Sequence, residues 1–442
     1  QTHTTLRDTR RRHILMQSRD NPLASLGDHS SSARSDIAAV VALVAAAVTA
    51  AALQRWHPGL ATVSGLLALC TTLMSTTVAN ILSTFRNERK QADLRRRVAE
   101  RERRKTLWQG ANPRFSPSLD CEASPRFDVD DPAMLEYLKS HGFVVVKGAA
   151  TAKDIDAAKD LLWEFLEEET GMRRAEAPTT WTNSNFKAVG DPVNGIVNGN
   201  GFGHSRFCWF VRTLPAVRAS FASIWGTEKL VSSFDGGNVF RPYHIGGADG
   251  PSHRTLGGWW HVDQGRTKRG LHAVQGLVSL YDATARTGGL CVVPGSHRTH
   301  ADLMSYAAMN DNDYVAVPEP TLNPVLQGAR LVTCKAGDLL LWDSRTIHCN
   351  TPAPDPLSAT ERLPGEADAL LRAVCYVCMT PRRWASRATL RARRAAFAAG
   401  IGSTHWPHEF RPLAPPESLE MVDPTRVESV LEECDRHVRE LV

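Results

Sequence analysis

The chain has 442 residues, of which 42% are hydrophobic and 22% charged, as is usual for a folded globular protein. This argues against a disordered, collagen-like or repeat-built chain, and the length allows one large domain with additions or two domains. The 52 Lys and Arg exceed the 47 Asp and Glu by a net charge of +5, which gives no reason to expect nucleic-acid binding.

Residues 1–109 differ in character from the rest. Two uncharged runs, 37–53 and 60–82, are separated by a turn at Pro58-Gly59, and arginines lie on both outer flanks. A membrane-spanning helix needs about 20 apolar residues, and positive flanks stay on the cytosolic side. We therefore expect a membrane hairpin through residues 37–82. A cleaved organelle-targeting leader and a pair of buried Ala-rich helices remain alternatives.

A basic segment and a linker follow. Residues 86–105 hold ten Lys or Arg and four interleaved Asp or Glu, a pattern typical of a solvated helix. Residues 110–132 contain Gly110 and four prolines without apolar periodicity, which marks a linker. The nine scattered cysteines argue against a disulfide framework and for a reducing compartment. Together with the expected hairpin, this predicts that the domain lies on the cytosolic side of a membrane.

From residue 133 the pattern is mainly β with flanking helices. Apolar spacing predicts helices at 134–138 and 152–169, the first ended by His141-Gly142. Short apolar runs separated by Gly and Pro turns predict strands at 143–146, 230–231, 237–240, 259–262, 274–281, 290–293, 330–334, 339–342, 346–349 and 371–379. Many short strands at this spacing favour a β-sandwich or barrel. Residues 386–442 are expected to form a helical extension, with helices at 385–399 and 427–441.

Three side chains form a candidate metal site. His261 and Asp263 are two residues apart on a predicted strand, so their side chains point to the same face. His348 follows on a later predicted strand. Two imidazoles and one carboxylate leave metal positions open, which is the facial triad of non-heme Fe(II) oxygenases. A zinc-dependent hydrolase with the same residues is an alternative.

The sequence resembles the phytanoyl-CoA dioxygenase family. The similar segments are Gly142 to Gly148, Trp260 to Gln264, Leu280 to His297, Ala336 to Leu339, and His348. The resemblance covers about 133–385 and implies a double-stranded β-helix (jelly roll) that uses Fe(II), 2-oxoglutarate and O₂. It also implies that His261, Asp263 and His348 bind the iron, and that Asp263 favours hydroxylation over halogenation.

The resemblance further implies an arginine that binds the far carboxylate of 2-oxoglutarate. Arg372 opens a predicted strand, whereas Arg362 lies in a Pro-rich loop, so we favour Arg372 because a strand fixes a clamp better. The gap from His348 to Arg372 is longer than usual in the family, which we explain by a loop insertion at 352–366. Asn350 is expected to contact the same co-substrate.

The substrate is expected to be a small or lipid-like molecule. Trp181, Asn183 and Trp209 lie in a segment rich in aromatic and amide side chains, and we expect them on the substrate side. A catalytically inactive, membrane-anchored jelly-roll binding protein is the alternative. The oligomeric state is left open.

Several other residues are expected to have structural roles and not to bind the metal. His297 and His300 are expected to be turn and surface residues, and Cys375 and Cys378 core residues, because positions i and i+3 face opposite sides of a strand. Asp343 and Arg345 flank the distal histidine and suggest a salt bridge. The spacing of His244, His253 and His272 does not require them to lie at the mouth of the site, and His405 and His408 are expected in a tail turn.

Overall fold

A computed structural model describes residues 119–176, 179–244, 253–306, 313–317, 324–357, 370–413 and 438–442, with the isolated residues 55 and 92. The chain divides into two units, 1–111 and 112–442, and all the described ranges belong to the second. The expected membrane hairpin at 37–82, the basic helix at 86–105, Arg362 and most of the helix at 427–441 lie outside the described residues. Among the described helices, none is long and apolar enough to cross a bilayer.

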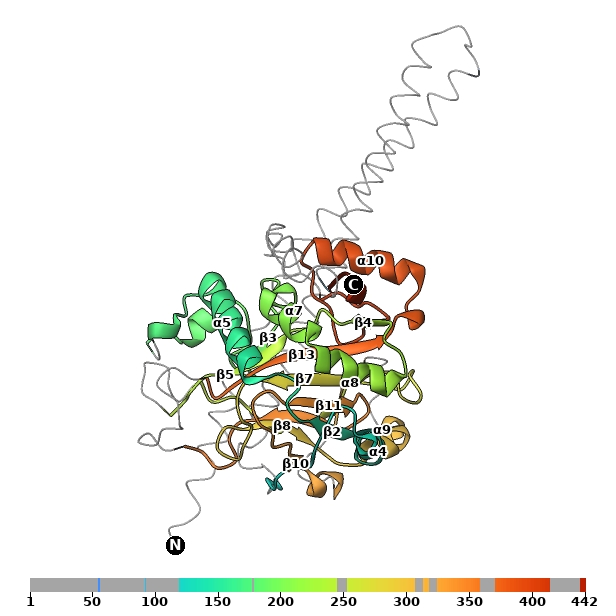
Figure 1. Cartoon of the computed structure of the whole chain (residues 1–442), viewed down its shortest axis with the longest axis horizontal. Helices are drawn as coiled ribbons and strands as arrows, with labels where there is room; N and C mark the ends of the chain where they lie inside the picture. The colour runs from blue at the N-terminus through green and yellow to red at the C-terminus, as the bar shows by residue number, and fades with distance from the viewer. Residues whose placement is uncertain are drawn as a thin grey trace. The chain divides into compact units, whose positions relative to one another are not determined.

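The second unit is mainly β, as predicted (Figure 1). Its strands are β1 (Arg126–Phe127), β2 (Phe143–Val146), β3 (Ile196–Val197), β4 (Leu230–Ser232), β5 (Gly237–Phe240), β6 (His261–Val262), β7 (Val274–Ser279), β8 (Gly289–Val292), β9 (Val315–Ala316), β10 (Arg330–Leu331), β11 (Leu339–Asp343), β12 (His348–Thr351) and β13 (Arg372–Pro381). Its helices are α4 (Pro132–His141), α5 (Ala152–Glu169), α6 (Asn183–Phe186), α7 (Arg206–Thr213), α8 (Pro215–Trp225), α9 (His300–Tyr306) and α10 (Arg387–Ala398).

The strands form two sheets. The larger has the order β1-β2-β11-β7-β13-β5-β3, with β4 paired to β13, and the smaller has the order β10-β8-β12-β6-β9. Following the chain, β5 lies in the larger sheet, β6 in the smaller, β7 in the larger and β8 in the smaller. After β9 and β10, which both lie in the smaller sheet, β11 lies in the larger sheet, β12 in the smaller and β13 in the larger. This winding between two sheets is that of a double-stranded β-helix.

Alternating side chains on the strands of the larger sheet contribute to two different cores. Along β11, Leu340 and Trp342 point between the two sheets, while Leu339 and Leu341 point to the outer face of the larger sheet. That outer face packs against α5, α7 and α8. Because such strands are buried on both faces, they appear in the sequence as continuous apolar runs.

The helices predicted at 134–138 and 152–169 both form, as α4 and α5, and capping residues mark the end of α4 and the start of α5. Thr151 and Asp154 make a reciprocal capping box at the start of α5, which spans the predicted residues 152–169. Gly142 ends α4 at φ 78°, a left-handed conformation that glycine adopts readily. α10 forms within the predicted 385–399, whereas α7 and α8 were not predicted as helices.

The predicted linker needs a correction at its C-terminal end. β1 pairs in parallel with β2, and Arg126 donates two hydrogen bonds of 2.7 Å to the buried carboxylate of Asp338. α4 starts at Pro132. The described residues 119–132 are therefore packed on the sheets. A two-residue strand held by an ion pair between an exposed arginine and a buried aspartate leaves no periodic apolar signal.

Candidate metal centre

Antiparallel pairing brings the three candidate ligands together. His348, the first residue of β12, is directly opposite His261, the first residue of β6, and their ring centroids are 4.3 Å apart. Asp263 follows β6, and its backbone N–H donates to the carbonyl of Ser344 at 3.1 Å. This hydrogen bond ties the end of β6 to the loop that leads to His348.

The ligand atoms converge. His261 Nε2 lies 3.4 Å from Asp263 Oδ1, and His348 Nε2 lies 3.2 Å from Asp263 Oδ2. One nitrogen or oxygen atom of each of the three residues lies within 4.8 Å of the others. All three residues are buried, with at most 8% of any of them exposed. Such a group suits a metal ion, because isolated buried charges would be costly.

Backbone carbonyls orient both imidazoles. His261 Nδ1 donates to the Trp259 carbonyl at 3.0 Å, and His348 Nδ1 donates to the Thr346 carbonyl at 3.0 Å. Because Nδ1 then carries the proton, the lone pair of each Nε2 points to the shared centre. The His261 ring is also stacked against Trp259 and Tyr314. The donor set of two imidazoles and one carboxylate fits Fe(II).

Asp263 carries the negative charge of the group. Burial raises its pKa, but the charges of His405, His261 and His348 outweigh burial, and the pKa of Asp263 lies well below its usual value. Burial lowers the pKa of His261. The group thus combines an ionised carboxylate at Asp263 with an imidazole at His261 that favours the neutral, metal-binding form.

Arg372 and Asn350 lie deeper between the sheets. Asn350 is two residues beyond His348 on β12, about 7 Å along the strand. Arg372 is 2% exposed; its Nε donates to Asn238 Oδ1 at 3.1 Å and its Nη2 to Asn350 Oδ1 at 3.2 Å. Its Nη1 is buried and has no hydrogen-bond partner among the described residues. An unpartnered guanidinium nitrogen at this depth fits the far carboxylate of a dicarboxylate whose other end is at the metal.

The three residues expected on the substrate side, Trp181, Asn183 and Trp209, all contact other parts of the domain. Arg241 donates to the backbone carbonyl of Trp181 at 2.9 Å and to the side-chain oxygen of Asn183. Trp209 is completely buried and packs against Phe234 and Phe397. These contacts place Trp209 in the helical core, while a substrate role for the other two remains a prediction.

The remaining sequence expectations have mixed outcomes. Cys375 and Cys378 are free, buried core residues, as predicted, and Arg345 forms the predicted ion pair with Asp343 at 2.6 Å. The expectation that His297 and His300 lie at the surface is wrong. They are 5% and 7% exposed, because His297 Nε2 bonds the Lys139 carbonyl and His300 Nε2 the Gln264 carbonyl.

Several residues near the site escaped sequence reasoning. Gln275 donates to Asp263 Oδ2 at 2.8 Å, and the Tyr376 hydroxyl accepts from Asn350 at 3.2 Å. His405 influences the pKa of Asp263, and its Nε2 is buried without a described hydrogen-bond partner. Period-two alternation from Arg372 along β13 would have indicated Tyr376. Nothing in the tail sequence indicates that His405 returns to the metal end.

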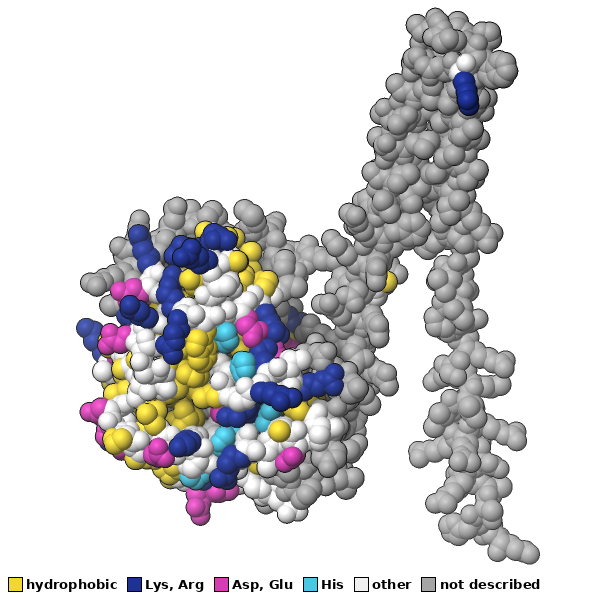
Figure 2. Space-filling model, turned by 90° about the vertical axis from the view of Figure 1, so that its right-hand side faces the viewer, with side chains coloured by type: hydrophobic (Ala, Val, Ile, Leu, Met, Phe, Trp, Pro, Cys, Tyr) yellow, Lys and Arg dark blue, Asp and Glu magenta, His cyan; other side chains and the backbone are white. Residues whose placement is uncertain are grey.

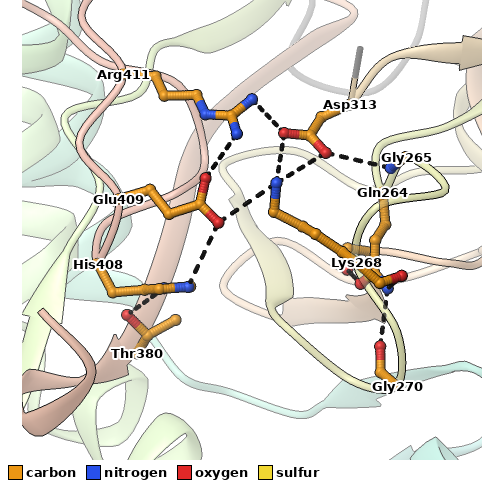
Figure 3. A network of polar contacts seen from close by, with 10 residues as sticks. Gln264, Gly265, Lys268, Gly270, Asp313, Thr380, His408, Glu409 and Arg411 are labelled. Carbon is orange, nitrogen blue, oxygen red and sulfur yellow. Dashed lines mark hydrogen bonds and ion pairs between the residues drawn. The ribbon is translucent and has the colours of Figure 1, made fainter. Parts of the chain in front are cut away.

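A second group of possible ligands is less suited to a metal. His272, His408 and Glu409 have ligand atoms within 4.8 Å of one another. Glu409, however, already pairs with Lys268 at 3.3 Å and Arg411 at 2.7 Å (Figure 3). Two neighbouring cations oppose a further positive charge there.

Residues 138–352 match the family described as phytanoyl-CoA dioxygenase (PhyH). This segment is a PhyH-family domain. It includes His261, Asp263, His348 and Asn350, and Arg372 lies beyond its end. PhyH domains depend on Fe(II) and 2-oxoglutarate, which are therefore the metal and co-substrate of this domain.

Individual proteins are also similar to this chain. Ava biosynthesis cluster protein O of Aspergillus versicolor is 24% identical over 322 residues, which cover 69% of this chain and 96% of that protein. The structure of EctD from S. alaskensis with bound Fe shares 14% identity and a TM-score of 0.38, over 61% of this chain and 83% of that chain. SnoK, a non-heme alpha ketoglutarate dependent carbocyclase from nogalamycin biosynthesis, shares 15% identity and a TM-score of 0.35, over 58% of this chain and 86% of that one.

Proposed function

We propose that this protein is an Fe(II)- and 2-oxoglutarate-dependent oxygenase that hydroxylates a C–H bond of a small or lipid-like molecule, with His261, Asp263 and His348 as the iron ligands. The convergence of the three ligand atoms carries the proposal, because a metal ion gives two buried imidazoles and a buried carboxylate a reason to lie together. Membership of the PhyH family supports it.

Different residues of the site would bind the metal and the co-substrate. The two Nε2 lone pairs and the Asp263 carboxylate would hold the metal on one side and leave the other side open for small molecules. Arg372, with Asn350 and Asn238 fixing its guanidinium, would bind the far carboxylate of 2-oxoglutarate. Bound together, Fe(II) and 2-oxoglutarate supply the activation of O₂ that oxidises the substrate while 2-oxoglutarate yields succinate and CO₂.

The walls of the site would keep bulk water out. Leu277, Leu290 and Val292 line the space between the sheets and are at most 2% exposed. Exclusion of water by these apolar side chains would strengthen the attraction between Arg372 and a carboxylate, because the local dielectric constant is low. The interpretation of residues 37–82 as a membrane hairpin, with the domain on the cytosolic side, stays a prediction from the sequence.

The test is 2-oxoglutarate turnover by the full chain. Purified protein with Fe(II), O₂ and 2-oxoglutarate should form succinate, slowly even without the substrate. His348→Ala should reduce Fe(II) affinity by more than about 100-fold, because replacing residues that only support a ligand already costs 10–100-fold. The control is His141→Ala, a histidine at the end of α4.

Two other outcomes would be decisive. Fe(II) binding without any succinate would favour the inactive binding protein. Turnover that needs zinc but not O₂ would favour the hydrolase. If turnover does occur, untargeted metabolite comparison between wild type and His261→Ala would identify the oxidised molecule.

A further inference from the structure

A cavity lies beside the candidate metal centre, at the same end of the barrel. Its volume is about 490 Å³, within the range of small-molecule sites. Three segments line it: residues 266–270, which follow Asp263; residues 297–304, which follow β8 and begin α9; and Arg345, three residues before His348. Two of the three segments thus lead directly from candidate iron ligands.

The lining of this cavity is strongly basic. Its charged side chains are Arg266, Lys268, Arg269, Arg298 and Arg345, and no Asp or Glu is among the described residues that line it. Lys and Arg side chains, with histidines among them, gather on the face shown in Figure 2, which is the side of Figure 1 where α9 lies. Such a concave cationic surface attracts anions.

Carboxylates neutralise only part of this charge. Lys268 binds both carboxylate oxygens of Asp313, at 2.7 and 2.9 Å (Figure 3), and Arg345 pairs with Asp343. Arg269 and Arg298 are exposed, and neither has a carboxylate partner within the described ranges. Two guanidinium groups from different segments therefore remain available to a ligand.

The walls are fixed before any ligand binds. The Gln264 side chain is fully buried and donates to the carbonyls of Lys268 at 3.1 Å and Gly270 at 2.8 Å, which folds residues 264–270 into a closed loop. His300 Nε2 is 2.7 Å from the Gln264 carbonyl and ties the second wall to the first. A preformed cavity loses little entropy on binding.

We propose that this cavity is a binding site for the phosphate groups of a small molecule, with Arg269 and Arg298 as its main contacts. A phosphate group offers oxygens in several directions, so guanidinium groups on separate walls can each bind it through two hydrogen bonds. The site does not depend on iron, and it holds whether or not the oxygenase proposal does.

The test uses the metal-free full chain and pyrophosphate as the probe. Titration calorimetry at low ionic strength should detect binding, and binding should weaken as salt is added. Arg269→Gln and Arg298→Gln should each reduce the affinity about tenfold or more, because each loses a charge-assisted contact. Both side chains are exposed, so the variants should unfold at the wild-type temperature.

Matched controls separate a site from diffuse attraction. Arg383→Gln and Arg387→Gln remove the same charge from exposed positions beside and within α10, and they should leave the affinity unchanged. Absence of pyrophosphate binding to the wild type, or an equal loss in the control variants, would overturn the proposal. Tighter binding of citrate than of pyrophosphate would overturn the assignment to phosphate.

Discussion

Gln275 on β7 donates a hydrogen bond of 2.8 Å to Oδ2 of Asp263, and so links the larger sheet to the carboxylate at the end of β6. Gln275 is 6% exposed, and the carboxylate oxygen it contacts is the one nearest to His348 Nε2. The amide therefore fixes the rotation of the carboxylate relative to both imidazoles.

Replacing this amide should weaken metal binding without removing a ligand. Gln275→Leu should reduce the affinity for Fe(II) by about 10–100-fold, because the carboxylate loses its orienting partner. Anaerobic Fe(II) titration would measure the change, and Gln327→Leu, at an exposed position, is the control. An unchanged affinity would mean that Asp263 needs no support from β7.

Arg372 should determine the affinity for 2-oxoglutarate. Arg372→Lys keeps the charge but loses the fork and leaves Asn238 and Asn350 without their donor. A hydrogen bond to a charged group contributes about 1.5–3 kcal/mol, so the dissociation constant of 2-oxoglutarate should rise about 10–100-fold. Calorimetry with the Mn(II)-loaded protein would measure it, with Arg383→Lys as the control; equal affinities would point to another arginine.

His204 should make the protein sensitive to acid. Burial lowers the pKa of His204 from 6.5 to about 3, partly offset by the hydrogen bond from Nε2 to the Ile401 carbonyl at 2.9 Å. Between these values the unfolded chain binds a proton that the folded protein does not. The free energy of unfolding should therefore fall as the pH drops from about 6.5 to about 3, by up to about 1.4 kcal/mol per pH unit.

The variant His204→Phe isolates this contribution. It keeps an aromatic ring beside Phe234 and Phe397 but cannot take up the proton. At pH 7 it should be less stable by about 1 kcal/mol, because it loses one hydrogen bond. Denaturant unfolding from pH 7 to pH 4 should show the difference shrinking and reversing, while His408, whose pKa is lowered to about 4 by burial, keeps some acid sensitivity in both proteins. Parallel curves would contradict the assignment.

Gly288 should be irreplaceable in the turn before β8. It has φ +78°, and an added Cβ would meet the carbonyl oxygen of Thr351 on β12. Gly148 has φ +61° but has open space around it, so Gly148→Ala should cost only the left-handed strain, about 1–2 kcal/mol. Gly288→Ala should cost clearly more, because backbone must move as well. Thermal unfolding of the two variants compares the effects, and equal losses would show that the turn relaxes freely.

The sequence predicted those parts of the fold that rest on local signals. Gly142, the apolar spacing of α5 and the short apolar runs of β5 and β11 gave element positions close to those observed. The short strands β1, β3 and β9 were missed, because two residues carry no periodicity and depend on a partner strand far along the chain.

The same distinction between local signals and long-range contacts applies to the candidate site. His261 and Asp263 could be grouped from their spacing, and His348 from its strand context. Gln275 and Asn238 could not, because sheet order rather than sequence distance brings them to Asp263 and Arg372. The prediction for His297 and His300 failed for the same physical reason. A local turn sequence predicts exposed side chains, but segments distant in the sequence cover both histidines.

Each imidazole of the proposed iron site is oriented by a carbonyl two residues earlier in its own chain segment. The backbone alone therefore sets the tautomer and the ring orientation of both histidines, without a bound metal. We therefore expect chelation to leave the fold and both ring positions unchanged, and activity to return on simple addition of Fe(II), with no refolding step.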